Sequence, residues 1–383
     1  MVEQGGQSAV DGLRVGVNVM WLQPGRVGGT EQYIRRVLAS ATEELDPAPS
    51  FRLFGTDSAF EAVAPAGAEH RPVDVSSSKI RRVVQERTSL RSEISLGLEH
   101  GLDLLHHPGG TVPFESSLPT VVTIHDLQPL ANPDNFGRVK AEYLARAIPE
   151  AVRRAHVVTT PSHWVASDIV NRFDVDADRV VVVSAFADMI DPSLNHEPSA
   201  AVKRILARGP VLLFPAMTMA HKNHRFLFDA FADARRIDPD IQLVCVGPAG
   251  RDHGELVDYA RQVSPHIHLL GHIPRPDLDA FYVRSEALVF PSMYEGFGLP
   301  ILEAQSAGLP VIASNTTAIP EVAGEGAILL APDDHDSWVA ALSQRPSGEA
   351  RAQLVAKGRE NMARFGPKST AQALSAAYLQ ARS

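Results

Sequence analysis

The sequence predicts an α/β protein of two domains, each built on a parallel β-sheet with helices on both faces. The chain of 383 residues exceeds what one hydrophobic core usually holds. Short β-rich runs alternate with amphipathic stretches, which is typical of parallel sheets. A proline-containing segment without clear periodicity, 191–200, separates two such series. We therefore expect a flexible tail, two domains and a final helix, over residues 1–12, 13–195, 196–369 and 370–383.

The first series begins with a βα unit. Apolar residues recur at helical spacing over 31–45, and Thr30 is placed to cap the first turn of that helix. The predicted strands of this series cover 13–22, 51–55, 102–106, 120–125, 156–160 and 179–184.

The second series repeats the alternation. Ligands of parallel sheets bind outside the carboxyl ends of the strands, so we expect the functional residues in strand-to-helix loops. The predicted strands of this series cover 211–216, 241–247, 267–272, 287–291, 310–314 and 327–330.

Charge and cysteine content narrow the function classes. A net charge of −9 gives no electrostatic reason to expect nucleic acid as a partner. The single cysteine, Cys245, lies in an apolar run and cannot form a disulfide framework. No apolar stretch reaches the roughly 18 residues of a membrane span, and residues 1–12 lack a signal-peptide pattern. We expect a cytoplasmic protein.

The stretch 79–91 mixes five basic residues with apolar ones and can form a cationic amphipathic helix. Such a helix can lie on an anionic membrane, which would allow peripheral contact at the inner membrane face. An ordinary solvated helix face is the favoured alternative.

The loop 292–300, Ser-Met-Tyr-Glu-Gly-Phe-Gly-Leu-Pro, follows a predicted strand and opens a helix that Gly308 ends. Its glycines let the backbone approach a ligand. Glu295 precedes the turn and can bind sugar hydroxyls, whereas Glu303 lies one turn into the helix and can accept hydrogen bonds from a vicinal diol. Two carboxylates at this spacing are, without other context, more often a helix-dipole partner and a solvated loop residue.

Three other loops carry candidate residues. Lys222, in His-Lys-Asn-His, is a suitable point charge for a diphosphate or else a solvated lysine. Gly28 and Gly29 either let the backbone approach the phosphates of one ligand or a second ligand, or only form a turn. His125 and Asp126 end the strand 120–125, where a histidine is more often structural than catalytic. His106 and His107 end another strand and either line the acceptor side or pack.

The segment from Glu295 to Glu303 resembles the Glu-x7-Glu motif of the family 4 glycosyltransferases, whose fold is GT-B. The resemblance covers nearly the whole chain and includes segments 271–278 and 318–324. It implies two Rossmann-like domains that face each other across a cleft, and a final helix that packs back on the N-terminal domain. It assigns donor binding to a set of residues: Glu295, Phe297, Gly298 and Leu299 on the sugar, Glu303 on the nucleotide ribose, Lys222 on the diphosphate, and Gly28 and Gly29 on the facing domain.

The resemblance also implies a retaining transfer. The acceptor hydroxyl attacks on the face that the diphosphate leaves, and the leaving phosphate accepts the proton. His125 would lie beside the donor sugar and support the developing charge, Asp126 would orient His125 or contact the acceptor, and Glu295 would complete the catalytic set.

We expect no metal and no cofactor. The four Asp-x-Asp pairs fall in apparent turns or helix starts, where aspartate is a common cap. These pairs are Asp174/Asp176, Asp176/Asp178, Asp238/Asp240 and Asp277/Asp279.

The donor is expected to be a nucleotide sugar, with GDP-mannose as the first candidate and UDP-glucose or dTDP-rhamnose next. The acceptor is a glycan, a lipid-linked sugar or a small molecule.

Two positions depart from the family pattern. Family members commonly pair the lysine with an arginine five residues earlier, where this chain has Met217. A branch with Pro-x5-His-Lys-Asn-His is similar at this loop, and either Arg225 or His221 can supply the second donor to a diphosphate. The segment 183–188 also replaces a Pro-Asn-Gly-like turn. A sugar-nucleotide epimerase, a phosphorylase or a silent nucleotide-sugar-binding partner subunit are the alternatives.

Overall fold

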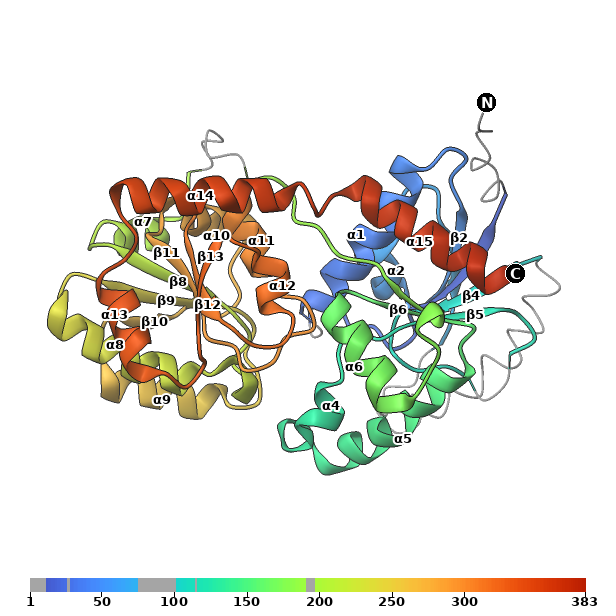
Figure 1. Cartoon of the computed structure of the whole chain (residues 1–383), viewed down its shortest axis with the longest axis horizontal. Helices are drawn as coiled ribbons and strands as arrows, with labels where there is room; N and C mark the ends of the chain where they lie inside the picture. Colours follow the sequence, from blue (N-terminus) through green and yellow to red (C-terminus); the bar gives the residue numbers. More distant parts are fainter. Residues whose placement is uncertain (1–11, 26–27, 75–100, 114–115, 191–196) are drawn as a thin grey trace. The chain divides into compact units, whose positions relative to one another are not determined.

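The computed structural model describes residues 12–25, 28–74, 101–113, 116–190 and 197–383 (Figure 1). The chain divides into two compact units. Unit 1 runs to Phe186 and includes Gly366–Ser383, and unit 2 is Ala187–Phe365. These divisions lie nine and four residues before the predicted ones at 195/196 and 369/370. The basic stretch 79–91 and nearly all of the predicted tail lie outside the described residues.

Unit 1 contains a seven-stranded sheet in the order β3-β2-β1-β4-β5-β6-β7, with every neighbouring pair parallel. Helix α15 packs against α1 within this unit (Figure 1). The strands are β1 Arg14–Asn18, β2 Ser50–Gly55, β3 Glu69–Pro72, β4 Leu104–His107, β5 Thr120–Thr123, β6 Val157–Thr160 and β7 Val180–Val182. The helices are α1 Gly29–Glu44, α2 Asp57–Val63, α4 Gln128–Ala131, α5 Arg138–Arg154, α6 His163–Phe173 and α15 Pro367–Arg382, with 3-10 turns η1 Pro133–Asn135 and η2 Ala177–Arg179.

Unit 2 contains a six-stranded parallel sheet in the order β10-β9-β8-β11-β12-β13. The strands are β8 Val211–Pro215, β9 Gln242–Val246, β10 Ile267–Leu269, β11 Ala287–Phe290, β12 Val311–Ser314 and β13 Ala327–Leu330. The helices are α7 Ala200–Leu206, α8 His224–Ile237, α9 His253–Val263, α10 Arg275–Arg284, α11 Leu299–Ser306, α12 Ile319–Ala323, α13 His335–Ser343 and α14 Gly348–Met362, with the 3-10 turn η3 Ala220–Lys222.

The core of unit 2 explains why these segments take their conformations. Strand β11, Ala-Leu-Val-Phe, is buried on both faces, so it is a continuous apolar run instead of an alternating one. Helix α8 buries Leu227, Phe228, Phe231 and Ala234, whose spacing places them on one stripe toward the sheet.

Both sheets change winding direction beside their first strand. In unit 1 the strand order reverses between β1 and β4, and in unit 2 it reverses between β8 and β11. The loops that leave the carboxyl ends of these strands diverge to opposite faces, which opens the crevice where parallel sheets bind ligands. The loops after β8 and β11 are the ones in which Lys222 and Glu295 were predicted.

The prediction of alternating parallel strands is confirmed, with two local differences. Strand β3 was missed because its four residues, Glu-His-Arg-Pro, are mostly exposed and carry no apolar pattern. Helix α1 begins at Gly29, so Thr30 lies inside the helix and the position before it is Gly28, which forms no side-chain cap.

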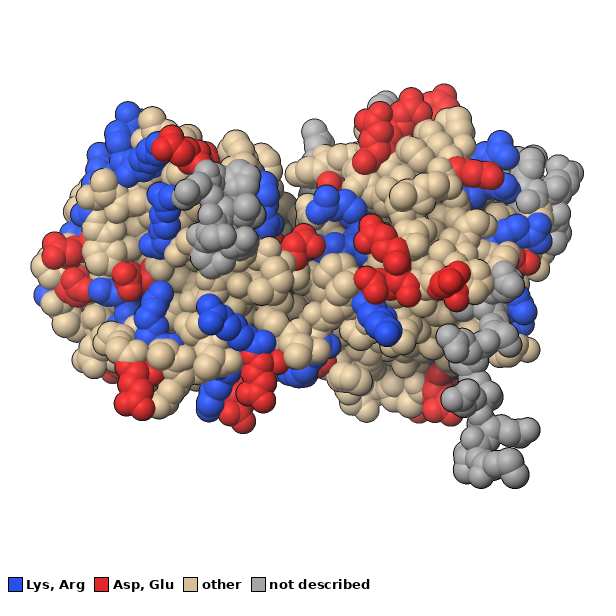
Figure 2. All heavy atoms as spheres, turned by 90° about the horizontal axis from the view of Figure 1, so that it is seen from above, with Lys and Arg blue, Asp and Glu red and all other residues tan. Residues whose placement is uncertain are grey.

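Acidic and basic side chains are interspersed on the face in Figure 2. Among the described residues, no helix is both long and apolar enough to cross a membrane.

Candidate functional site

The loops after β8 and β11 are joined by an ion pair. Lys222 Nζ lies 2.6 Å from Glu295 Oε1, and the two side chains are 17% and 12% exposed. The backbone N–H of Met293 donates to the carbonyl of His221 at 2.8 Å, which ties the two loops together. The sheet's switch point thus unites a cation and a carboxylate that are 73 positions apart in the chain.

A third loop, which follows β12, is hydrogen-bonded to Glu295. The N–H of Glu295 donates to Thr317 Oγ1 at 3.0 Å, and the N–H of Ala318 donates to the Glu295 carbonyl at 3.4 Å. Thr317 holds a φ of 54°, a left-handed conformation that costs a β-branched residue energy. The segment 318–324, which is part of the family resemblance, therefore stabilises the Glu295 loop through the backbone N–H of Ala318.

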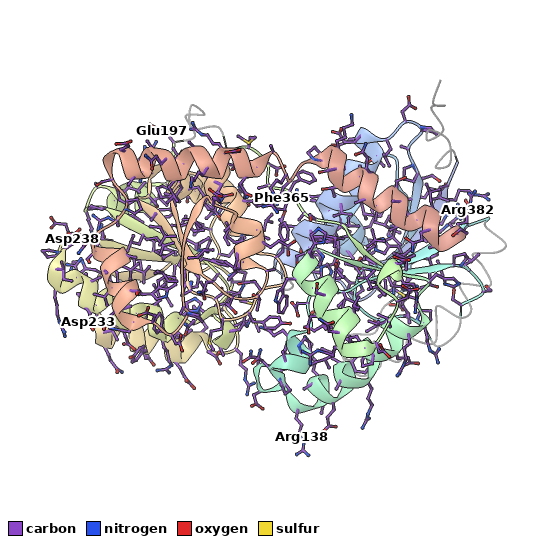
Figure 3. The ribbon with its side chains drawn as sticks, viewed as in Figure 1. Arg138, Glu197, Asp233, Asp238, Phe365 and Arg382 are labelled. Carbon is purple, nitrogen blue, oxygen red and sulfur yellow. The ribbon has the colours of Figure 1, made fainter. Side chains whose placement is uncertain are left out.

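Phe297, Gly298 and Leu299 form the start of α11. Gly298 occupies the cap position with a φ of 107°, which only glycine adopts without strain. The buried ring of Phe297 meets the ring of Phe365 edge to face at 5.7 Å; Figure 3 labels Phe365. The side chain of Phe297 is thereby committed to packing, and only its backbone and those of Gly298 and Leu299 are left to serve a ligand.

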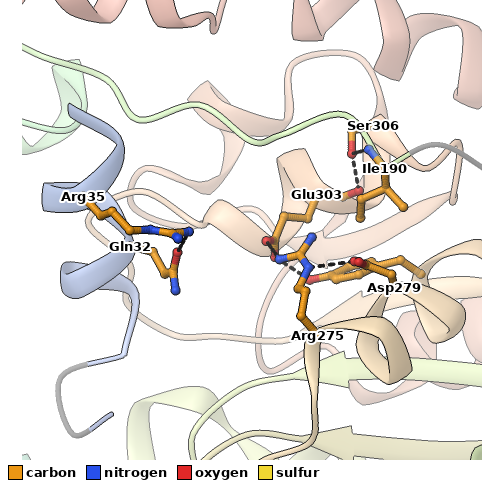
Figure 4. Close-up of polar contacts among 8 residues, drawn as sticks. Gln32, Arg35, Ile190, Arg275, Asp279, Glu303 and Ser306 are labelled. Atoms are coloured by element: carbon orange, nitrogen blue, oxygen red, sulfur yellow. Dashed lines mark hydrogen bonds and ion pairs between the residues drawn. The ribbon is translucent and has the colours of Figure 1, made fainter. Parts of the chain in front are cut away.

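Glu303 is buried and both of its carboxylate oxygens are bonded. Arg275 Nη1 donates to Oε1 at 2.7 Å, and the Tyr282 hydroxyl donates to Oε2 at 2.8 Å. Arg275 Nε also donates to Asp279 at 2.8 Å (Figure 4). Burial, and after it the charge of Glu303, raises the pKa of Tyr282 well above its usual 10.0, so the phenol remains a proton donor.

Sequence reasoning missed Arg275 and Tyr282. A signal was present, because Arg275, Asp279 and Tyr282 recur at i, i+4 and i+7 and so share one face of α10. Polar side chains in this pattern predict a helix face that contacts charged groups and not the hydrophobic core.

The two histidines beside Lys222 are kept neutral by burial. Burial first, and then Lys222, lowers the pKa of His221 to about 4, and the same two causes lower the pKa of His224 to about 3. His224 is 2% exposed, and neither ring nitrogen has a partner among the described residues. Its ring lies 4.7 Å from that of Phe214. Arg225 pairs with Glu255 at 3.2 Å, and its guanidinium lies over the ring of Tyr259. Neither of these contacts involves Lys222.

In unit 1, His125 is fixed by two neighbours. Its Nε2 lies 2.8 Å from the Pro108 carbonyl, which can only accept, so Nε2 carries the proton. The ring of Tyr33 meets it edge to face at 5.0 Å. Burial lowers the pKa of His125 to about 4, and the bond to Pro108 opposes this. Asp126 Oδ1 accepts the N–H of Gln128 at 2.9 Å and so shapes the turn into α4.

His106 and His107 are fully enclosed. His106 lies between the Tyr378 hydroxyl at 2.9 Å and Thr123 Oγ1 at 2.8 Å. His107 Nδ1 lies 3.3 Å from Asn18 Nδ2. Burial lowers the pKa of both histidines to about 3. His106 thus joins α15 to the sheet of unit 1, which is a packing role.

The glycine pair of unit 1 divides into a required and a replaceable position. Gly28 has a φ of 57° and precedes α1, a conformation that favours glycine. A Cβ on Gly29 would meet nothing within 4 Å, so packing does not demand glycine there.

The aspartate pairs have other partners. Asp176 Oδ1 accepts the N–H of Asp178, Asp238 pairs with Arg345, and Asp277 accepts the N–H of Ser199. No group of three or more His, Cys, Asp or Glu that could hold a metal is found in the part of the chain that the structure describes.

Two all-parallel sheets, each in its own α/β unit, and a charged site at the switch point of the second define a two-domain Rossmann-like protein. Residues 27–190 match the family described as Glycosyltransferase Family 4, and residues 209–345 match Glycosyl transferases group 1. The two matches together span most of the chain, which belongs to the family 4 glycosyltransferases and has their GT-B fold.

Two relatives agree with this family. O-antigen chain mannosyltransferase B of Escherichia coli is 29% identical over 225 residues, 57% of this chain and 58% of that protein. O-antigen chain mannosyltransferase RfbU of Salmonella typhimurium is 27% identical over 266 residues, 66% of this chain and 67% of that protein. The first match thus spans less than two thirds of its relative.

Two solved structures share the fold. Sucrose-phosphate synthase of Thermosynechococcus elongatus has a TM-score of 0.73 at 17% identity, with 96% of this chain and 98% of that chain covered. Anabaena HepE, solved in complex with UDP and glucose, has a TM-score of 0.69 at 17% identity, with 95% and 98% covered.

Proposed function

We propose that this glycosyltransferase moves a hexose or deoxyhexose, with mannose as the first candidate, from a nucleotide-sugar donor to a hydroxyl acceptor, with retention and without a metal ion. The observation that carries the proposal is the pair of engaged carboxylates around the start of α11. Glu295 is bonded to Lys222, and Glu303 is bonded to Arg275 and Tyr282. Mannose comes first because two relatives are named mannosyltransferases.

In this proposal each partner of the ion pair meets a different part of the donor. Lys222 exchanges Glu295 for the diphosphate, because a lysine ammonium is a compact charge that suits phosphate oxygens. Glu295, once released, accepts hydrogen bonds from sugar hydroxyls near the backbone of Phe297, Gly298 and Leu299. Glu303 accepts hydrogen bonds from the ribose hydroxyls.

The proposed transfer needs no protein nucleophile. The acceptor hydroxyl attacks the anomeric carbon on the face that the diphosphate leaves, the glycosidic bond to the phosphate breaks, and the leaving phosphate takes the hydroxyl proton. Burial keeps the His125 ring neutral and the bond to Pro108 fixes its orientation, so the ring supplies a fixed dipole near the charge that develops on the sugar. The acceptor is a glycan, a lipid-linked sugar or a small molecule in the cytoplasm.

Thermal unfolding of the full chain with GDP-mannose, UDP-glucose and dTDP-rhamnose tests the donor. A ligand at about 100 times its Kd stabilises the folded state by about 2.7 kcal/mol. We expect one donor to raise the Tm, equally with EDTA and with Mg²⁺, and NMR of the product to show a retained anomeric configuration. No shift with any donor would refute donor binding. A shift or activity that EDTA abolishes and Mg²⁺ restores would refute metal independence, and an inverted product would refute retention.

A further inference from the structure

Arg275 and Tyr282 reach Glu303 from a single face of α10. Arg275 is the first residue of that helix, and Tyr282 lies seven positions later, about two turns on the same side. Glu303 lies on α11, so the carboxylate is bridged to a second helix by two side chains. The position of the Glu303 carboxylate therefore depends on α10.

The two contacts differ in character. The Tyr282 side chain is fully buried, and its hydroxyl bonds Glu303 Oε2 from inside the unit. The Arg275 side chain is 44% exposed and divides its donors between Glu303 Oε1 and Asp279. Tyr282 fixes one oxygen from the core side, and Arg275 fixes the other from the solvent side.

A carboxylate held at both oxygens has little freedom to rotate. A vicinal diol needs acceptors at fixed positions, and positions fixed before binding cost no side-chain entropy at binding. The free Glu303 side chain would otherwise lose several rotamers when a nucleoside binds.

We infer that Arg275 and Tyr282 are positioning residues that hold the Glu303 carboxylate in place for the ribose of the nucleotide donor. The inference rests on the proposed function, because it takes Glu303 to bind ribose. The preference for ribose over 2′-deoxyribose then depends on two residues that need not contact the sugar themselves.

The experiment measures the dissociation constants of UDP and dUDP, and of GDP and dGDP, by calorimetry on the full chain. The wild type is expected to bind the ribonucleotide of one pair at least about tenfold more tightly than its deoxy form, since one hydrogen bond to a charged group corresponds to about that ratio. Arg275→Ala and Tyr282→Phe are expected to bring this ratio close to one while deoxynucleotide affinity changes little. Arg275→Lys is expected to restore part of the ratio.

Matched controls exist elsewhere in unit 2. Arg345 pairs with Asp238 at 2.8 Å, and the Tyr259 hydroxyl donates to Asp229 at 2.6 Å. Arg345→Ala and Tyr259→Phe break equivalent bonds and are expected to leave the ribose ratio unchanged. Circular dichroism and Tm measurements verify that each variant is folded.

Four outcomes overturn the inference. A ratio that survives both substitutions shows that Glu303 needs no positioning. A ratio that the control substitutions also abolish shows a general loss of structure. A wild type that binds these nucleotides without ribose preference refutes the inference alone, whereas a wild type that binds none of them refutes the proposed GDP-sugar and UDP-sugar donors as well.

Discussion

The two sheets carry opposite kinds of polar residue at the ends of their strands. In unit 1 the strand-end residues His106, His107 and His125 are neutral, because burial lowers the pKa of each to about 3 or 4. In unit 2 the loops after β8 and β11 hold the Lys222–Glu295 ion pair. The neutral rings of His106 and His107 are enclosed, whereas the side chains of the ion pair are partly exposed. The proposed diphosphate contact at Lys222 accordingly lies in the charged loops of unit 2.

The largest expected effect tests the neutral side of this comparison. His125→Ala is expected to lower kcat by about 100- to 1,000-fold, since a fixed polar group near developing charge contributes that much. Donor affinity, measured by calorimetry, is expected to change little because the Lys222–Glu295 and Arg275–Glu303 ion pairs lie in unit 2. Tyr33→Phe keeps the aromatic edge on His125, removes the hydroxyl that donates to Val183, and serves as the control with a small effect. Unchanged turnover in His125→Ala would show that His125 is structural.

The next effect tests the charged side. Lys222→Ala is expected to weaken nucleoside diphosphate binding by about 10- to 100-fold, because a hydrogen bond to a charged group contributes about 1.5–3 kcal/mol. Lys357→Ala, which breaks an exposed pair with Glu325 of 2.9 Å, is the matched control and should not change binding. Diphosphate affinity unchanged in Lys222→Ala would remove the phosphate role.

Glu295→Gln separates the two roles of the same ion pair. Without the carboxylate, Lys222 has no competitor for the diphosphate, so UDP or GDP should bind at least as well as to the wild type. The corresponding nucleotide sugar should bind more weakly, because the sugar hydroxyls lose a charged acceptor. Equal changes for nucleotide and nucleotide sugar would contradict this division of roles.

The smallest expected effect concerns stability. The pKa of His224 is lowered to about 3, below its unfolded value of 6.5, so folding excludes the charged form. The stability contributed by the neutral ring is full above pH 6.5 and is lost as the pH falls toward 3. His224→Leu removes unpartnered buried nitrogens and should raise the unfolding free energy by about 1 kcal/mol at neutral pH and by more at pH 5.

Denaturant unfolding at several pH values measures this effect. His163→Leu, at an exposed position, is the control substitution. A pH dependence in His224→Leu that equals the wild type would show that the burial of His224 does not control acid stability. A loss of donor binding in the same variant would place His224 in the site.

The strand prediction was accurate where strands are apolar and failed where one is not. All twelve predicted strands are present, including β11, whose four residues are apolar and buried. Strand β3 was missed because an exposed edge strand needs no apolar pattern. The prediction that Thr30 caps this helix was wrong. The helix begins at Gly29, and its cap position is Gly28, which has a φ of 57° and forms no side-chain cap.

The sequence alone determined two parallel-sheet units and the loops that carry Glu295, Glu303 and Lys222, because hydrophobic period and loop glycines are local properties of the chain. Only the tertiary structure decided the partners. Lys222 meets Glu295 because the sheet reverses order between β8 and β11, and Glu303 meets Arg275 and Tyr282 because α10 presents one face to α11. Such pairings depend on strand order and helix packing, which join residues far apart in the sequence and so leave no local pattern that identifies the partner.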